Sequence, residues 1–172
     1  MKNLNLCGFA ACLMLAALSC TSQTPKTEAL QSSGAAKLEN RFSDGVVGTH
    51  DVAILNDLLA DNFVSHHFPA PGNNNKAAFT GGMTGLFAGF PDIKVTRLQQ
   101  YEQGDKVFTY AFWEATHTGT FMGIPPTGKK VHVEYMDIWR AENGKIAENW
   151  VVMDIMGLMI QLGVVPPPGA TK

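Results

Sequence analysis

The spacing of apolar residues changes once along the chain. Between Leu38 and Asp61 apolar residues recur every three or four positions, with a break near Gly48, and this pattern predicts two helices. The same spacing over residues 76–90, ended by Pro91, predicts a third helix. We therefore expect the first part of the folded region to be helical.

From Asp92 onward apolar and polar residues alternate, which is the period of a strand with one buried face. The alternation predicts four strands, within residues 93–101, 106–121, 130–141 and 145–154. Phe63 and Val64 predict a shorter extended segment before them. Helices followed by a meander of strands favour an α+β fold, with the helices on one face of an antiparallel sheet.

Asn143 and Gly144 separate the last two predicted strands. This dipeptide suits the positive backbone angles of a two-residue type I′ turn, and regular pairing from it places Val133 opposite Asp154. We expect one face of this hairpin to line a pocket. Its side chains are those of Val133, Tyr135, Asp137, Trp139, Ile146, Glu148, Trp150, Val152 and Asp154. The opposite face is mixed in character, and both a half-solvated surface and a homodimer contact fit it.

Asp137 and Asp154 share this otherwise aromatic and aliphatic face, with Glu148 nearer the hairpin turn. Burial raises the pKa of a carboxyl group, so both aspartates suit proton transfer near neutral pH. The alternative is structural: either one hydrogen-bonds a neighbouring helix or lies at the rim of the sheet.

His66 and His67 close an extended segment just before a loop, where a side chain can reach the mouth of a pocket. Acid/base or hydrogen-bonding roles compete with a loop histidine that has no role. A metal site is disfavoured because no cluster with ligand spacing accompanies them. We expect His117 and the tryptophans to be structural, although Trp150 beside Asp137 also suits ligand contact.

The first twenty residues have the layout of a signal peptide. Lys2 precedes an apolar run over residues 6–18, which is too short to span a membrane. Residues 17–20 resemble a lipobox, which predicts lipid attachment to Cys20 in a bacterial cell-envelope lipoprotein. Ordinary secretion or a buried helix are the alternatives. Membrane contact is expected only through this anchor.

Residues 21–37 are polar and low in apolar surface, which predicts a flexible linker after the signal peptide of residues 1–20. A single domain follows over residues 38–166, with a short tail at 167–172. With 13 basic and 15 acidic residues, the formal charge is -2, so nucleic acid is not an expected partner. The three cysteines all lie in the signal region, so the domain has no cysteine nucleophile or Cys-based metal site.

Several segments occur in the order that is typical of one family. They are residues 63–66, 89–92, 117–131 (HTGTFMGIPPTGKKV), 137–140, 143–150, Asp154 and 161–163. Over residues 38–166 this succession resembles the SnoaL-like polyketide cyclases, also called ester cyclases, of the nuclear-transport-factor-2-like superfamily. The resemblance implies a cone-shaped barrel, formed by a curved antiparallel sheet packed on N-terminal helices around an apolar pocket.

The resemblance also implies chemistry. Family cyclases close a ring by intramolecular aldol condensation with acid/base side chains and without metal or cofactor. Asp154 matches the position of the proton-transferring aspartate, and His66 and Asp137 match positions that face the pocket. Two departures stand out: Tyr110 replaces a common arginine, and Val151 replaces a common aspartate. Loss of the arginine suits a neutral substrate.

The favoured hypothesis is a cofactor-free enzyme that performs aldol-type cyclisation, or a related isomerisation, on a small apolar carbonyl compound. The candidate catalytic residues are Asp154, Asp137 and His66, and the candidate substrate contacts are Tyr135, Trp150, Tyr110 and Val152. A non-catalytic lipoprotein that binds a small apolar molecule is the alternative. An epoxide hydrolase ranks last, because Arg140 is predicted to face away from Asp137.

Overall fold

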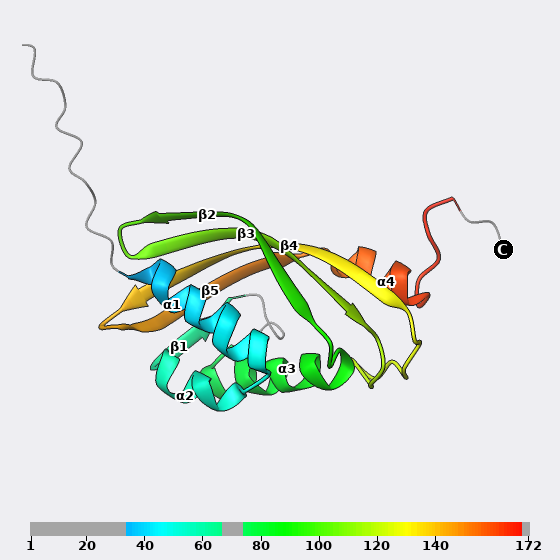
Figure 1. Cartoon of the computed structure of the whole chain (residues 1–172), viewed down its shortest axis with the longest axis horizontal. Helices are drawn as coiled ribbons and strands as arrows, with labels where there is room; N and C mark the ends of the chain where they lie inside the picture. Colours follow the sequence, from blue (N-terminus) through cyan, green and yellow to red (C-terminus); the bar gives the residue numbers. More distant parts are fainter. Residues whose placement is uncertain (1–33, 67–73, 170–172) are drawn as a thin grey trace, which may run out of the picture.

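The computed structural model describes residues 34–66 and 74–169 (Figure 1). The predicted signal peptide, Cys20, most of the predicted linker, and His67 lie outside the described residues. The first helix, α1, runs over Ala35–Arg41, so the last residues assigned to the linker are helical. No helix in the described part is long and apolar enough to cross a membrane.

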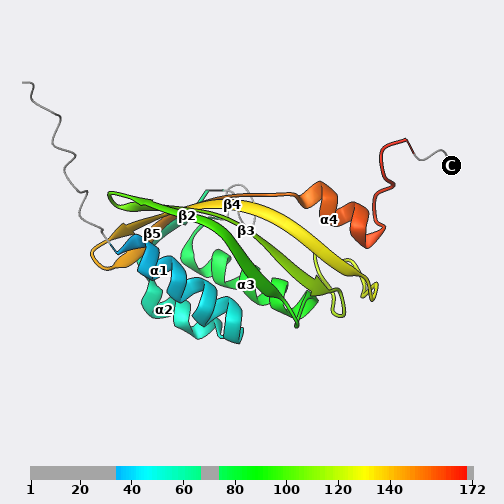
Figure 2. The same ribbon diagram turned by 45° about the horizontal axis from the view of Figure 1, so that its top comes forward.

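A curved five-stranded sheet forms one layer of the domain, with the order β1-β5-β4-β3-β2 (Figures 1 and 2). The strands are β1 Leu59–Ser65, β2 Lys94–Gln103, β3 Lys106–Thr116, β4 Lys130–Glu142 and β5 Lys145–Met153. The last four form the predicted antiparallel meander. β1, predicted only as a short extended segment, pairs in parallel with β5. The predicted α+β fold is confirmed.

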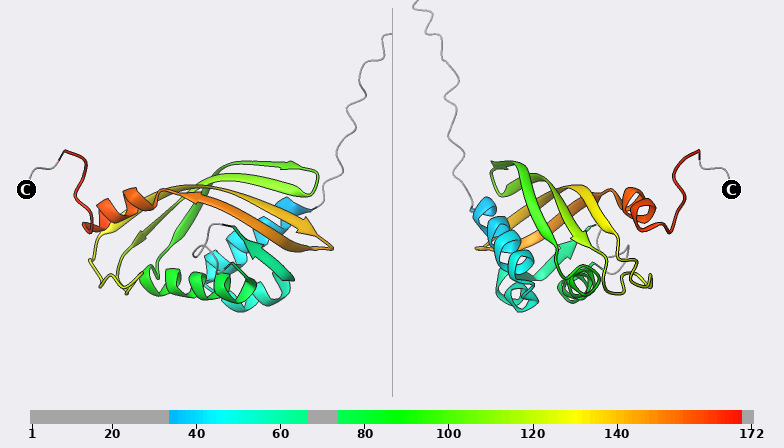
Figure 3. Two further views of the ribbon diagram at one scale, coloured as in Figure 1. Left: turned by 180° about the vertical axis from the view of Figure 1, so that it is seen from behind. Right: turned by 45° about the vertical axis from the view of Figure 1, so that its right-hand side comes forward.

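The N-terminal helices pack together against the concave face of the sheet (Figure 3). α1 continues into a π-helix, η1, over Phe42–Val47, and a 3₁₀ turn, η2, over Val52–Ile54 leads into α2, Leu55–Leu58. The predicted third helix is α3, Lys76–Gly89. A fourth helix, α4, over Ile155–Leu162, lies beyond the end of the sheet and was not predicted.

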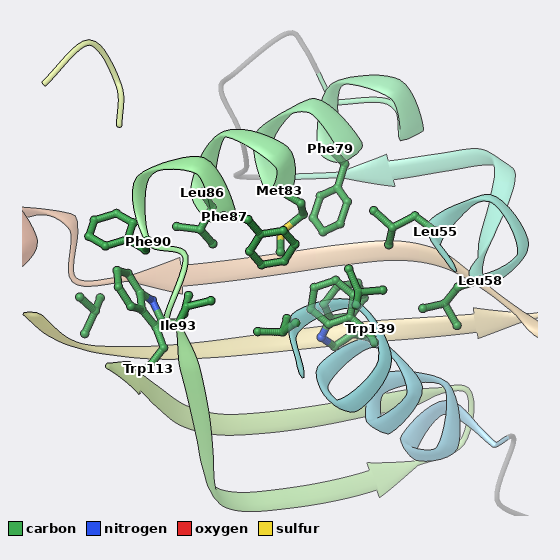
Figure 4. Packing of buried hydrophobic residues seen from close by; sticks show 14 of the residues in the cluster. Leu55, Leu58, Phe79, Met83, Leu86, Phe87, Phe90, Ile93, Trp113 and Trp139 are labelled. Atoms are coloured by element: carbon green, nitrogen blue, oxygen red, sulfur yellow. The ribbon is translucent and has the colours of Figure 1, made fainter. Parts of the chain in front are cut away.

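Aromatic and aliphatic side chains fill the space between the helices and the sheet (Figure 4). Phe79 of α3 packs edge-on against Trp139 of β4, with ring centroids 6.0 Å apart. Phe90, just after α3, packs edge-on against Trp113 of β3 at 5.1 Å. These contacts hold α3 over the sheet, although its glycines weaken its intrinsic helix propensity.

The loop after β3 is held from inside the domain. His117 is fully buried, and its Nδ1 lies 3.1 Å from the hydroxyl oxygen of Thr127. Gly119 passes so close to the carbonyl of Ala88 that an added Cβ would lie 1.9 Å from its oxygen. His117 therefore packs within the fold, as the sequence predicted, and holds the GIPPTGK loop through Thr127. The backbone N–H groups of Thr118 and Gly119 join this segment to the carbonyl of Gly89 at the end of α3.

The predicted hairpin turn between β4 and β5 is present, but the register beyond it is wrong. Asn143 and Gly144 have φ of 51° and 75°, as a type I′ turn requires. Ala141 pairs with Ile146 as expected, but Arg140 then pairs with Glu148, so Ala147 forms a β-bulge. The bulge buries Ile146 and Ala147 together, which regular alternation does not allow.

The bulge exchanges the two faces of β5 for every residue that follows it. Asn149, Val151 and Met153 face the helices, whereas Glu148, Trp150 and Val152 face outward. β4 contains no bulge here, so its predicted inner face of Val133, Tyr135, Asp137 and Trp139 is retained. A shift of one residue is enough to exchange the two faces of β5, because successive side chains of a strand point to opposite faces.

Candidate functional site

A cavity of about 70 Å³ lies between the helices and the concave face of the sheet. Its walls are almost entirely apolar. The lining side chains are those of Phe42, Val47, Phe79, Met83, Leu86, Ile93, Val95, Trp113, Tyr135, Asp137, Trp139, Asn149, Val151 and Met153. Figure 4 shows Trp113 and Trp139 at opposite ends of this space, with Met83, Leu86 and Phe87 of α3 between and above them.

Asp137 is the one carboxyl group among the described residues that line the cavity. Its side chain is 5 % exposed, and its Oδ1 has no hydrogen-bond partner in the described part of the chain. Burial raises its pKa from 3.8 to about 7. The nearby Trp139 indole and Thr109 hydroxyl partly oppose that rise in pKa, although neither makes a hydrogen bond of normal geometry to Oδ1.

Two indole N–H groups are also buried without a partner among the residues described, those of Trp113 and Trp139. Leaving a buried donor unpaired costs about 1–3 kcal/mol, so an acceptor placed beside either indole N–H would be favourable. Tyr135 adds a phenol to the wall, and burial raises its pKa, so the phenol stays protonated. The cavity therefore combines an apolar wall with donors and one titratable acid.

A second, larger cleft of about 620 Å³ adjoins the cavity between η1 and the start of β2. Val47, Ile93 and Val95 line both spaces, so the cavity and the cleft share this part of their walls. The cleft is more polar, with Arg97 and His50 among its lining residues.

A buried polar cluster anchors α1 beside this cleft. Glu39 is almost fully buried and accepts hydrogen bonds from Ser43 at 2.6 Å, Arg97 at 2.9 Å and Gln100 at 2.5 Å. Burial raises the pKa of Glu39, and its charge adds to the rise at Asp137. The cluster links α1 to β2. Both carboxylate oxygens of Glu39 therefore have hydrogen-bond partners, unlike Oδ1 of Asp137.

Asp154 does not face the cavity, contrary to the prediction. It is exposed at the start of α4, where its Oδ1 accepts a hydrogen bond from the backbone N–H of Gly157 at 2.7 Å. Val152, a predicted substrate contact, is 70 % exposed on the outer face. The bulge at Ala147 is the cause, since it turns the following side chains of β5 to the other face.

His66 and Trp150 meet on the outer face as well. Their rings stack in parallel with centroids 4.4 Å apart, and Nε2 of His66 lies 2.9 Å from a carboxylate oxygen of Glu148. Glu148 also accepts a hydrogen bond from Arg140 at 2.6 Å. These predicted pocket residues therefore form a surface cluster on the far side of the sheet from Asp137.

Tyr110 lies on the outer face too, and its hydroxyl donates a hydrogen bond to Glu134 at 2.9 Å. Tyr110 is therefore not among the residues that line the cavity. The structure thus brings Asp137 and Tyr135 together in the cavity, and separates them from Asp154, His66, Trp150, Tyr110 and Val152.

Sequence reasoning assigned no site role to Val151, Met153 and Asn149 on β5, or to the residues of η1 and β2 that complete the cavity. The sequence analysis noted Val151 only as a departure from the aspartate that the family resemblance implies, and it drew no site role from that. Among the described residues no three His, Cys, Asp or Glu side chains gather as a metal site.

The fold defines the class of protein: a nuclear-transport-factor-2-like α+β domain, here with a mostly apolar cavity between helices and sheet. More particularly, the chain belongs to the SnoaL-like polyketide cyclase family, whose model matches residues 37–162. No curated protein sequence matches the chain.

Solved structures with the same fold include a Jannaschia sp. CCS1 protein assigned as a SnoaL-like polyketide cyclase. It is 21 % identical, with a TM-score of 0.71 over 78 % of this chain and 95 % of that one. IdmH of Streptomyces antibioticus, assigned as a polyketide cyclase, is 26 % identical, with a TM-score of 0.65 over 75 % and 98 %. TsrD of Streptomyces laurentii is 24 % identical, with a TM-score of 0.67 over 76 % and 95 %.

Proposed function

We propose that this protein is a cofactor-free enzyme that uses Asp137 for acid/base chemistry on a small apolar carbonyl compound, in an aldol-type cyclisation or a related isomerisation. One observation carries the proposal: a buried carboxyl group with an unpaired oxygen faces an apolar cavity. With a pKa of about 7, Asp137 exchanges a proton readily in either direction at neutral pH.

In the proposed reaction the Asp137 carboxylate removes a proton from the carbon beside a substrate carbonyl. The enolate oxygen then accepts a hydrogen bond from the indole N–H of Trp139, which is two residues away on the same face of β4 and has no other partner among the described residues. After the new bond or the shifted double bond has formed, Asp137 returns the proton. The reaction is an isomerisation, so no net proton or electron is consumed.

The valine opposite Asp137 supports this assignment. Asp137 and Val151 are directly paired across β4 and β5, and both line the cavity. An aspartate at position 151 would place two carboxylates side by side. In this chain the valine leaves Asp137 as the only carboxyl group in the described cavity wall and makes its surroundings more apolar.

The test compares two asparagine variants. Asp137→Asn is expected to lower turnover by about 10²–10⁴-fold, the usual contribution of a general acid/base group. Asp154→Asn is the matched control: asparagine also caps a helix, so activity and folding are expected to be retained. Carbonyl compounds that the natively purified protein retains, identified by mass spectrometry, supply the substrate.

The competing function is non-catalytic binding of a small apolar molecule. Under this function, a compound that co-purifies with the protein is recovered chemically unchanged from both wild type and Asp137→Asn. Loss of turnover in Asp154→Asn, with turnover retained in Asp137→Asn, contradicts the proposed assignment.

We also propose that the protein is exported and carries lipid on Cys20. The proposal rests on the signal-like residues 1–20 and the polar segment that follows them. Intact mass measurement of protein from bacterial membranes is expected to show cleavage before Cys20 with added acyl chains. Replacement of Cys20 by serine is expected to abolish the lipid and release the domain from the membrane.

A further inference from the structure

Trp113 carries the one buried, unpaired polar group in the described cavity wall that the proposed reaction does not use. Its indole Nε1 has no hydrogen-bond partner among the described residues, and the side chain is 2 % exposed. Phe90 packs against the ring at 5.1 Å, and Ile93 lies beside it in the cavity wall (Figure 4). The ring is therefore held in place by its neighbours, with a donor that protein atoms leave unsatisfied.

The position of Trp113 relative to Asp137 follows from strand pairing. Trp113 pairs with Val133 of β4, and Thr109 pairs with Asp137 of the same strand. Val133 and Asp137 are four residues apart, which is about 13 Å at roughly 3.3 Å per residue. The unpaired Trp113 donor and the acid therefore lie at separate places along one apolar space. Figure 4 shows the corresponding separation of Trp113 and Trp139.

The size of the cavity limits what can lie between these two places. A volume of about 70 Å³ that extends along this length is narrow. It suits a thin chain or a single small ring better than a broad fused-ring system. The side chains along this space, Met83, Leu86 and Val95, are apolar and match such a chain.

We propose that Trp113 is a specificity-determining residue whose indole N–H binds a second oxygen of the substrate, far from the carbonyl that reacts. The substrate class is then a narrow apolar molecule with a hydrogen-bond acceptor at each end: one at Trp113, and one between Asp137 and Trp139. The second contact rests on the proposed function, whereas the contact at Trp113 stands on the unpaired donor and the cavity alone.

The chain is well suited to a direct test because it contains only three tryptophans. Protein labelled with ¹⁵N in the indoles gives three N–H signals, and Trp150, outside the cavity, is an internal control. The probes are nonane-2,8-dione and its matched monoketone, nonan-2-one. We expect the dione to move the Trp113 proton signal downfield, as hydrogen-bond formation does, and to leave Trp150 in place.

Binding affinity gives the second measurement. One added neutral hydrogen bond is worth about 1 kcal/mol, so the dione is expected to bind wild type roughly fivefold more tightly than the monoketone. Trp113→Phe keeps an aromatic ring and removes the N–H. In this variant the two probes are expected to bind equally. Trp150→Phe is the matched control and is expected to keep the dione preference.

Several results overturn the inference. These are equal affinity of the two probes for folded wild type, a preference that survives in Trp113→Phe, and no binding of either probe at millimolar concentration. If Trp113→Phe does not fold, the shift of the wild-type Trp113 signal and the affinities of wild type for the two probes still test the inference. The proposed function fails separately, through turnover in Asp137→Asn, so the two failures are distinguishable.

Discussion

The inner and outer faces of β4 and β5 each carry a carboxyl group near a tryptophan, in opposite circumstances. On the outer face Glu148, His66 and Arg140 satisfy one another within hydrogen-bonding distance. On the inner face Asp137 and Trp139 are buried without hydrogen-bond partners among the described residues. A paired surface carboxylate gains little from a ligand, whereas an unpaired buried one gains much. The two carboxyl groups therefore differ in what a ligand can offer them, because they differ in pairing.

The largest expected effect concerns the pH dependence of stability at Asp137. The pKa of Asp137 is 3.8 in the unfolded chain and about 7 in the fold, so folding favours the protonated form. Stability is then greatest below pH 4, falls as pH rises toward 7, and is constant above it. The full fall is roughly 4 kcal/mol at 1.36 kcal/mol per pKa unit.

Denaturant unfolding of wild type and Asp137→Asn across pH 4 to 9 measures this effect. The difference between the two proteins isolates the group, because all other titrations are shared. We expect the free energy of unfolding of Asp137→Asn, relative to that of wild type, to rise between pH 4 and 7. A difference that does not change with pH would show that Asp137 is not buried as a titrating acid.

The next effect compares neighbouring positions on β5. Val151→Asp places a second carboxylate opposite Asp137 and is expected to cost about 3 kcal/mol at pH 8, the scale of an uncompensated buried charge. Val152→Asp adds the same group to an exposed site and is expected to change stability by less than about 0.5 kcal/mol. Unfolding of the two variants tests the bulge directly, because regular pairing from the turn predicts the reverse order.

A smaller effect concerns the cap of α4. Asp154→Ala removes the oxygen that accepts from Gly157 and is expected to cost about 1 kcal/mol, whereas Asp154→Asn is expected to cost much less. Thermal unfolding separates the two variants. Equal losses in both would mean that charge, rather than the capping hydrogen bond, is what matters at this position.

The smallest effect is expected at the outer cluster. The hydrogen bond from His66 is the main cause that lowers the pKa of Glu148, and both side chains are partly exposed. Solvent weakens such pairs, so Glu148→Gln is expected to cost less than about 1 kcal/mol and to leave turnover unchanged. A loss of turnover comparable to that of Asp137→Asn would move the active site to the outer face.

Much of the fold could be predicted because its signals are local. The period of two gave the four antiparallel strands, and Asn143-Gly144 gave the turn. Tyr135 and Asp137 were placed correctly in the pocket wall, because β4 alternates without interruption next to β5. The parallel strand β1 was predicted only as a short extended segment, because a short strand carries little periodicity. Helix α4 was not predicted, although Leu158, Met159 and Leu162 recur at helical spacing.

The sequence by itself determined which residue types are available to a pocket and which strand carries Asp137. Only the tertiary structure decided which side chains join it, because one bulged residue, Ala147, reverses every later side chain of β5. A bulge costs little locally and is selected by packing, in this case by burial of both Ile146 and Ala147. Local periodicity does not contain this packing information. It therefore could not predict that Val151 lines the cavity and that Asp154 caps a helix.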